Sequence, residues 1–189
     1  MPFATLVKNL KKQQRELRVL IIGLDSSGKT TCVRNLLGLE TDSVQPTLGF
    51  QIQQFTTENS QIALWDVGGQ RTIRAFWKSF CDSTDGLFWV LDSADSERLY
   101  TAIDALNEVL GAERLKGCPV IVFGNKQDIE GAKTQDQLEK LFVFENRDVR
   151  IFTGSGRNGV GITEAFDWLV EKMESSGETG GFIDLEAIY

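Results

Sequence analysis

The chain has 189 residues, of which 41% are hydrophobic and 25% are charged, so one domain with a substantial core is expected. Its net charge of −7 argues against a surface that binds nucleic acid. The absence of histidine, and of C-x-x-C spacing among the three cysteines, argues against a zinc site and indicates reduced thiols in a cytosolic protein. No apolar run reaches the roughly 18 residues that a membrane-spanning helix needs.

The first half of the chain alternates between helix and strand patterns. Residues 3–12 carry apolar side chains at helical spacing and lysines on the other face, which predicts a short amphipathic helix. The apolar run 17–23 predicts a buried parallel strand, and residues 28–38 predict a helix. Two strand-like runs follow, at 50–57 and 61–67, and the short segment between them predicts a hairpin.

The second half continues the alternation. Residues 86–92 and 118–125 are apolar runs of the buried-strand type, with a helix between them marked by Leu99, Leu106 and the stop signal Gly111. Further elements are expected as follows: a helix that begins at a capping box of Thr134 and Gln137 and runs to about residue 144, a strand at 149–154, and a helix at 162–173. The pattern predicts an α/β fold with a six-stranded, mostly parallel sheet, one antiparallel hairpin strand and helices on both faces.

Three regions are expected along the chain. They are an N-terminal amphipathic helix within residues 1–16, a main domain over 17–174 and a flexible tail over 175–189. The start of the tail, "SSGETGG", has the composition of a flexible linker. The end, "FIDLEAIY", fits a disordered tail as well as it fits a docking motif.

A phosphate-binding loop is predicted at residues 23–30, where "GLDSSGKT" follows the first strand and precedes a helix. Glycines let the backbone turn sharply and point its N–H groups at phosphate oxygens, and the helix N-terminus adds a favourable dipole. Lys29 would reach the β- and γ-phosphates, and the Thr30 hydroxyl would ligate Mg²⁺. The expected phosphate contacts are Asp25, Ser26, Ser27, Gly28, Lys29, Thr30 and Thr31.

The second motif, "NKQD" at residues 125–128, follows a buried strand and would face the same sheet edge. Asp128 can accept two N–H bonds from a guanine edge, and adenine offers no matching pair. The motif resembles the guanine-specificity motif of Ras-like GTPases, which implies that Asn125 braces the loop and Lys126 lies along the base. In "GSGR", at residues 154–157, the family pattern implies a last base contact near Ser155 and Gly156. A nucleotide-binding kinase or ATPase would share the phosphate loop but not this base loop.

Two further segments complete the predicted site. In "WDVGGQR", Asp66 fits a residue that holds a Mg²⁺-bound water, and Gly69 can present its N–H to a γ-phosphate. Gln70 can orient an attacking water, which is the role of a glutamine in Ras-like enzymes. In "PTLGF", Thr47 is available to close over the γ-phosphate and Mg²⁺. The expected catalytic residues are Gln70 and Lys29, and the expected metal ligands are Thr30 and Thr47, with Asp66 acting through water.

The chain resembles the Arf and Arf-like small GTPases over residues 3–173 through four motifs, "GLDSSGKTT", "PTLGF", "WDVGGQ" and "NKQD". The resemblance implies a Ras-like P-loop G domain that binds GTP or GDP with Mg²⁺ and hydrolyses GTP. It also implies an exchange factor, an activating protein and effectors as partners, with Phe50, Trp65 and Phe80 as an exposed aromatic trio that binds effectors. The alternative from another class is a nucleotide-binding interaction module without significant hydrolysis.

Within that family, "QRELRVLIIGLDSSGKTT", "DSTDGLFWVLDSAD" and "RAFWKSF" are most similar to the Arf-like proteins linked to tubulin folding cofactors. Their close relatives release lipidated cargo from carrier proteins, so a tubulin cofactor or a prenyl-binding carrier is the expected effector. Pro2 stands where Arf proteins carry a myristoylated glycine, which leaves at most weak, unlipidated membrane contact. A cytoplasmic, cytoskeleton-associated monomer is expected, and an Arf-type regulator of vesicle trafficking at membranes is the alternative.

Slow hydrolysis is expected from two features of the sequence. Asp25 lies within the phosphate loop, where its charge would add to the negative charge of the transition state. No arginine is evidently placed to act as a finger in cis, so a partner would supply the missing charge, a step worth roughly 10³–10⁵ in rate.

Overall fold

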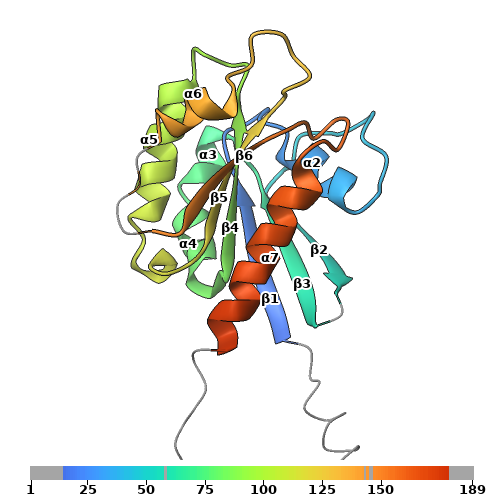
Figure 1. Ribbon diagram of the computed structural model, residues 1–189, viewed down its shortest axis with the longest axis vertical. Helices are drawn as coiled ribbons and strands as arrows, with labels where there is room; N and C mark the ends of the chain where they lie inside the picture. Colours follow the sequence, from blue (N-terminus) through green and yellow to red (C-terminus); the bar gives the residue numbers. More distant parts are fainter. Residues whose placement is uncertain (1–14, 58, 143, 145–146, 179–189) are drawn as a thin grey trace, which may run out of the picture.

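A six-stranded sheet organises the fold of the computed structural model, which describes residues 15–57, 59–142, 144 and 147–178 (Figure 1). The strand order is β2-β3-β1-β4-β5-β6, and only the β2–β3 pair is antiparallel. The strands are β1 (Arg15–Ile22), β2 (Phe50–Thr56), β3 (Ser60–Val67), β4 (Gly86–Asp92), β5 (Val120–Asn125) and β6 (Val149–Thr153). This confirms the predicted mixed sheet with a single antiparallel hairpin strand.

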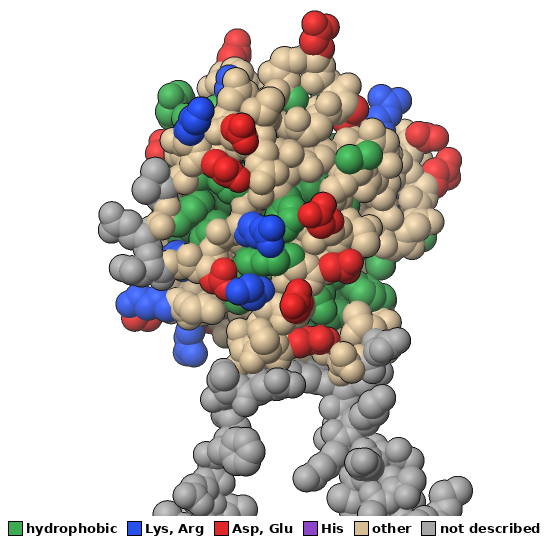
Figure 2. Space-filling view, in the orientation of Figure 1, with side chains coloured by type: hydrophobic (Ala, Val, Ile, Leu, Met, Phe, Trp, Pro, Cys, Tyr) green, Lys and Arg blue, Asp and Glu red, His purple; other side chains and the backbone are tan. Residues whose placement is uncertain are grey.

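Helices cover both faces of this sheet, as the sequence predicts (Figure 1). They are α2 (Lys29–Leu36), α3 (Arg71–Arg74), α4 (Trp77–Phe80), α5 (Leu99–Leu110), α6 (Gln135–Glu139) and α7 (Ile162–Glu178), with two 3₁₀ turns, η1 (Cys81–Ser83) and η2 (Glu113–Leu115). None of the helices in the described part of the chain is long and apolar enough to cross a membrane. Acidic and basic side chains are interspersed over the face that Figure 2 shows.

The core has two layers because successive strand residues point to opposite faces. In β4, Leu87, Trp89 and Leu91 pack toward α4 and α5, whereas Phe88 and Val90 pack toward α2 and α7. Central strands buried on both faces must be apolar throughout, and this is why their sequences read as continuous hydrophobic runs. The three cysteines belong to these layers, since Cys32, Cys81 and Cys118 are all buried and free.

Two helices differ in length from their predicted extents. The capping box of Thr134 and Gln137 is present, yet α6 ends at Glu139 rather than near residue 144. The chain turns there because Phe142 leaves the helix to enter the core, where its ring stacks on Phe144 at 5.8 Å.

The last helix, by contrast, is longer than expected. It continues to Glu178, so the first residues of the predicted linker, 175–178, are helical. The hydroxyls of Ser175 and Ser176 donate hydrogen bonds to the carbonyl of Lys172 at 3.0 and 2.8 Å, and these bonds are compatible with the helix. The remaining tail and the predicted N-terminal helix at 3–12, together with Pro2, lie outside the described residues.

The fold brings the ends of five strands to one edge of the sheet. The phosphate loop follows β1, Asp66 lies near the end of β3, and Asn125 ends β5. Asp92 ends β4 and is paired in register with Asn125. The carboxyl edge of a parallel sheet is the usual position of a ligand site, so the fold places the predicted nucleotide residues where such a site is expected.

The inner face of α5 should contribute strongly to stability. Leu106 is fully buried in the core, so Leu106→Ala should lower the free energy of unfolding by about 2–5 kcal/mol. Tyr100 on the same helix is 69% exposed, and Tyr100→Ala should change the free energy of unfolding by less than about 0.5 kcal/mol. Urea unfolding at one fixed nucleotide concentration measures both values, and equal losses would contradict the assigned helix orientation.

Candidate functional site

The loop between β1 and α2 encloses a cavity of about 460 Å³ together with segments 44–47 and 68–70. Gly28 caps α2 in a left-handed conformation with φ 90°, and a β-carbon there would collide with the side-chain amide of Asn125. Ser26 also has a positive φ, 61°. The tight turn aims the start of α2 into the cavity, which is the arrangement that phosphate binding requires.

Lys29 is the buried cation of this cavity. Its side chain is 6% exposed, and its ammonium donates to the carbonyls of Gly23 and Leu24 at 3.1 and 2.9 Å. Burial lowers the pKa of Lys29 to about 8, although the negative charges of Asp66 and Asp25 oppose this shift. An anionic ligand in the cavity would therefore favour the charged form of this ammonium.

Three oxygen-bearing side chains converge beside Lys29. Thr30 Oγ1 donates to Asp66 Oδ2 at 2.6 Å and lies 2.8 Å from Thr47 Oγ1. Thr47 Oγ1 also donates to the same carboxylate oxygen, at 3.3 Å. Burial raises the pKa of Asp66 above its ordinary value, against the hydrogen bond from Thr30 and the charge of Lys29.

These residues fit a hard cation. Two hydroxyls and a carboxylate form the oxygen donor set that Mg²⁺ prefers. Within the described chain, Asp66 Oδ1 and the neighbouring Ser27 Oγ are buried and accept or donate no hydrogen bond. Both atoms could be satisfied by a bound cation, its waters or a phosphate group, so the donor set supports the metal ligands expected from the sequence.

The "NKQD" segment joins the phosphate loop through Asn125. The Asn125 amide nitrogen donates to the carbonyl of Ser27 at 2.7 Å, and its oxygen accepts from the backbone N–H of Gly156 at 2.7 Å. Asp128 accepts a hydrogen bond from the Ser155 hydroxyl. Asn125 thus ties together three loops that lie far apart in the sequence.

A second hollow, of about 340 Å³, lies beside the first and is lined by Asn125, Lys126 and Asp128. The two hollows share Gly28, Thr31 and Lys126 in their linings. The structure therefore brings the predicted phosphate and base residues to one continuous depression. Ser155 is 1% exposed and lies behind Asp128, so it supports the base loop and does not line the hollow.

Gly69 and Gln70, the predicted residues near the γ-phosphate, also line the first cavity. Gly68 lines it as well, and Gln70 immediately precedes the short helix α3. The carbonyl of Gly69 accepts a hydrogen bond from the backbone N–H of Asp25 at 3.1 Å. The loop that carries Gln70 is therefore in direct contact with the phosphate loop.

The aromatic trio forms a cluster of which only Phe50 is exposed, whereas Trp65 and Phe80, also expected to be exposed, are partly buried against the core. Phe50 stacks on Trp65 at 5.5 Å and meets the edge of Phe80 at 5.4 Å, and Phe50 is 49% exposed. The Arg18 guanidinium lies over the ring of Trp65, 3.6 Å from its centroid, a distance typical of a cation–π contact. We call Phe50, Trp65 and Phe80 the aromatic cluster.

Sequence reasoning assigned no role to two residues at this site, Asp92 and Arg157. Lys126 pairs with Asp92 at 2.6 Å, and Arg157 lines the base hollow. Asp92 lies at the end of β4, and this position at a strand end was a signal that could have identified it from the sequence. Arg157 is the last residue of the "GSGR" segment, which predicts a base contact nearby but assigns no role to the arginine itself.

The charge of Asp25 has two arginine partners. The sequence identified no arginine placed to act as a finger in cis, and in the structure Arg74 and Arg98 both form ion pairs with the carboxylate of Asp25, at 2.7 and 3.2 Å. Asp25 is therefore a compensated charge, which the sequence did not predict, and its expected slowing of hydrolysis stays a prediction. The two arginines lie 49 and 73 positions from Asp25, so spacing alone could not reveal them.

Comparison with known proteins gives a consistent result. The profile of the ADP-ribosylation factor family matches residues 3–173. The ADP-ribosylation factor-like protein 2 of Arabidopsis thaliana is 41% identical over 179 residues, which cover 93% of this chain and 97% of that protein. The ADP-ribosylation factor-like protein 3 of Chlamydomonas reinhardtii is 36% identical over 92% of this chain and 100% of that protein.

A solved structure shows the same fold. The Arl6 BBS3 small GTPase from Trypanosoma brucei, with the nucleotide analogue GppNp bound, matches this structure with a TM-score of 0.78 and 29% sequence identity. The match covers 85% of this chain and 98% of the other.

Nucleotide affinity should depend on the protonation of Lys29. Above about pH 8 the nucleotide-free protein loses this proton, which binding must restore, so affinity for GDP should fall by up to about tenfold per pH unit. Calorimetric titration from about pH 7 to about pH 9 at fixed free Mg²⁺ measures the slope. Lys29→Arg keeps its charge over this range and should flatten the slope, and equal slopes in both proteins would contradict the assignment.

Base preference should depend on Asp128. Replacing its carboxylate with an amide in Asp128→Asn removes an acceptor for guanine, so GDP affinity should fall about 10- to 100-fold and xanthosine diphosphate should become the better ligand. Competition binding with the two nucleotides measures the change. Asp136→Asn, an exposed residue on α6, is the matched control and should leave the preference unchanged.

Proposed function

Because the chain belongs to the ADP-ribosylation factor family, it is a small GTPase that binds GTP or GDP with Mg²⁺ and hydrolyses GTP, and we propose that its GTP-bound form presents the aromatic cluster to effector proteins. As in small GTPases generally, an exchange factor, an activating protein and effectors act on this cycle. The proposal concerns how occupation of the cavity is communicated to the surface.

One observation carries the proposal: Asp66 and two residues of the aromatic cluster, Phe50 and Trp65, share the β2–β3 hairpin. Trp65 and Asp66 are consecutive in β3, so their side chains point to opposite faces, one to the aromatic cluster and one to the hydroxyls of Thr30 and Thr47. Thr47 precedes Phe50 by three residues, and Gly68 donates to the carbonyl of Gly49 at 2.8 Å. A displacement of Thr47 or Asp66 therefore acts directly on the backbone that holds Phe50 and Trp65.

The residues of the cavity support hydrolysis by positioning and charge. Lys29 lies at the start of α2, where a buried ammonium would stabilise charge on the phosphate oxygens. Gln70 lines the same cavity and would orient the attacking water. When bound by Thr30 and Thr47, with Asp66 behind them, Mg²⁺ neutralises negative charge on the phosphates.

For the partner, we propose a carrier of prenylated cargo or a tubulin folding cofactor, and for the location the cytoplasm, including sites on the cytoskeleton. Support comes from the similarity to ADP-ribosylation factor-like proteins 2 and 3, and from the three sequence segments that resemble that branch. The surface also fits a protein partner, since Leu48, Phe50 and Ile52 are all exposed near the cavity. A regulator of vesicle trafficking is the alternative, and it would bind membranes instead.

The aromatic cluster should control effector affinity. In a Gln70→Leu background, which keeps the GTP form, Phe50→Ala should weaken binding to a purified prenyl-binding carrier or tubulin cofactor by about tenfold or more. The exposed Tyr100 provides the control, and Tyr100→Ala should have no effect. Titration calorimetry gives the affinities, and nucleotide content is checked in each variant.

Three outcomes bear on the proposal. Tight binding by Gln70→Leu and none by Thr30→Asn, which should fail to hold GTP, would support the switch. Equal binding of the effector by the Gln70→Leu and Thr30→Asn proteins would contradict the switch. Binding of the GTP form to anionic vesicles, without affinity for either protein partner, would favour the trafficking alternative.

A further inference from the structure

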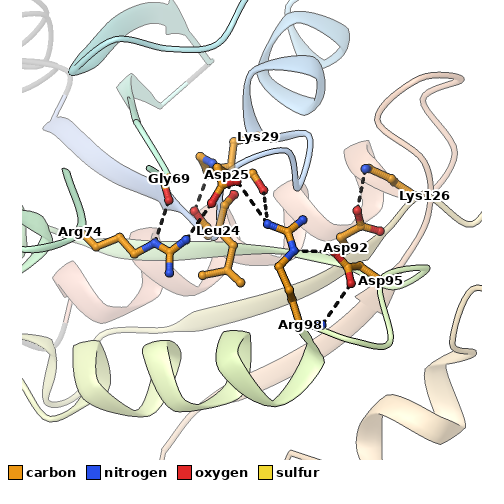
Figure 3. Close-up of polar contacts among 10 residues, drawn as sticks. Leu24, Asp25, Lys29, Gly69, Arg74, Asp92, Asp95, Arg98 and Lys126 are labelled. Carbon is orange, nitrogen blue, oxygen red and sulfur yellow. Dashed lines mark hydrogen bonds and ion pairs between the residues drawn. The ribbon is translucent and has the colours of Figure 1, made fainter. Parts of the chain in front are cut away.

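The carboxylate of Asp25 lies between two arginines that come from different parts of the fold (Figure 3). Arg74 Nη2 donates to Asp25 Oδ1 at 2.7 Å, and Arg98 Nη1 donates to Asp25 Oδ2 at 3.2 Å. Burial raises the pKa of Asp25, but the hydrogen bond from Arg74 and the charges of both arginines hold it below its ordinary value. Asp25 is therefore ionised at neutral pH and electrostatically compensated.

The two arginines have unequal surroundings. Arg98 precedes α5 and is fixed by Asp95, which accepts from its side-chain Nε at 2.6 Å and from its backbone N–H at 3.1 Å. It also donates to the backbone carbonyl of Asp25 at 3.3 Å. Arg98 therefore anchors the phosphate loop to a helix whose inner face is part of the core.

Arg74 instead connects the phosphate loop to the turn that carries the catalytic glutamine. Its Nε donates to the carbonyl of Gly69 at 2.8 Å, while Nη2 of the same guanidinium holds Asp25 (Figure 3). Arg74 ends α3, and its backbone N–H donates to the carbonyl of Gln70 at 3.1 Å. A single side chain thus spans the phosphate loop and the Gly69–Gln70 turn, with Gln70 held one helical turn away.

The contact between these two loops leaves no spare space. A β-carbon on Gly69 would collide with the backbone of Gly23, Leu24 and Asp25. The carbonyl of Gly69 already accepts from the Asp25 N–H at 3.1 Å, so the arginine supplies a second donor to the same oxygen. The orientation of the Gly69 peptide, and with it that of Gln70, depends on both donors.

We propose that Arg74 is a positioning residue that locks the Gly69–Gln70 turn onto the phosphate loop and so supports the γ-phosphate side of the site. This inference rests on the nucleotide site described above but is independent of the proposed effectors. GDP has no γ-phosphate to meet this turn, so the lock serves the GTP form selectively. Arg74 acts through Gly69 and Asp25 and needs no contact with the substrate.

The selectivity provides the test. Arg74→Ala should speed dissociation of the hydrolysis-resistant analogue GTPγS about tenfold, as expected for loss of hydrogen bonds to a charged group, and leave GDP dissociation within about twofold. Single-turnover hydrolysis of GTP should slow by about the same factor. Arg74→Lys keeps the charge but not the fork that reaches both oxygens, so it should restore part of the loss.

Arg71 offers a matched control on the same helix. It is exposed and has no ion pair within the part of the chain that the structure describes, so Arg71→Ala should leave both dissociation rates within about twofold. A double-mutant cycle adds a readout that a merely structural role would not change. In an Asp25→Asn background, Arg74→Ala should lose about half or more of its effect on a logarithmic scale.

The outcomes separate this inference from the site beneath it. If Arg74→Ala speeds the dissociation of GTPγS but not that of GDP, and if this effect shrinks in the Asp25→Asn background, the lock is supported. Equal acceleration of GTPγS and GDP, or an effect independent of Asp25, would overturn it while leaving the nucleotide site intact. Weak binding of both nucleotides by the wild-type protein would contradict the site itself, and the lock with it.

Discussion

Asn125 provides the constraint on which the nucleotide site depends. One side-chain amide joins the phosphate loop, the base loop and the loop after β6, by donating to Ser27 and accepting from Gly156 at 2.7 Å each. Since Asn125 is 2% exposed, breaking either hydrogen bond would leave a buried polar group unsatisfied. Asn125 therefore links the phosphate and base hollows directly, and Gly28 must lack a side chain to allow the contact.

The charges in the site impose a different requirement. Lys29 and Asp66 are both buried. Burial lowers the pKa of Lys29 and raises the pKa of Asp66, so it favours the neutral form of each side chain. An apolar pair of similar size would be easier to bury, so these groups reflect the needs of a ligand and not those of the fold. Asp25 differs, because its two arginines compensate its charge at a partly exposed position.

Much of this arrangement could be predicted from local sequence. Continuous apolar runs identified the strands because both faces of the sheet are covered, and glycine spacing identified the phosphate loop because the backbone must turn there. The end of α6 could not be predicted, since Phe142 leaves the helix for a core site that only the folded chain creates. The same holds for Arg74 and Arg98, whose shared partner is brought to them by the pairing of β1 with β3 and β4 in the sheet.

The buried cysteine of α2 has a consequence for the chemical reactivity of the protein. Cys32 is 3% exposed, burial raises the pKa of its thiol to about 12, and Gly156 of the loop after β6 packs against it. Alkylating reagents attack the thiolate, so the folded site should hide this sulfur from them almost completely. Reaction at Cys32 then requires α2 and the loop after β6 to separate, so its rate reports how often the protein opens around its nucleotide.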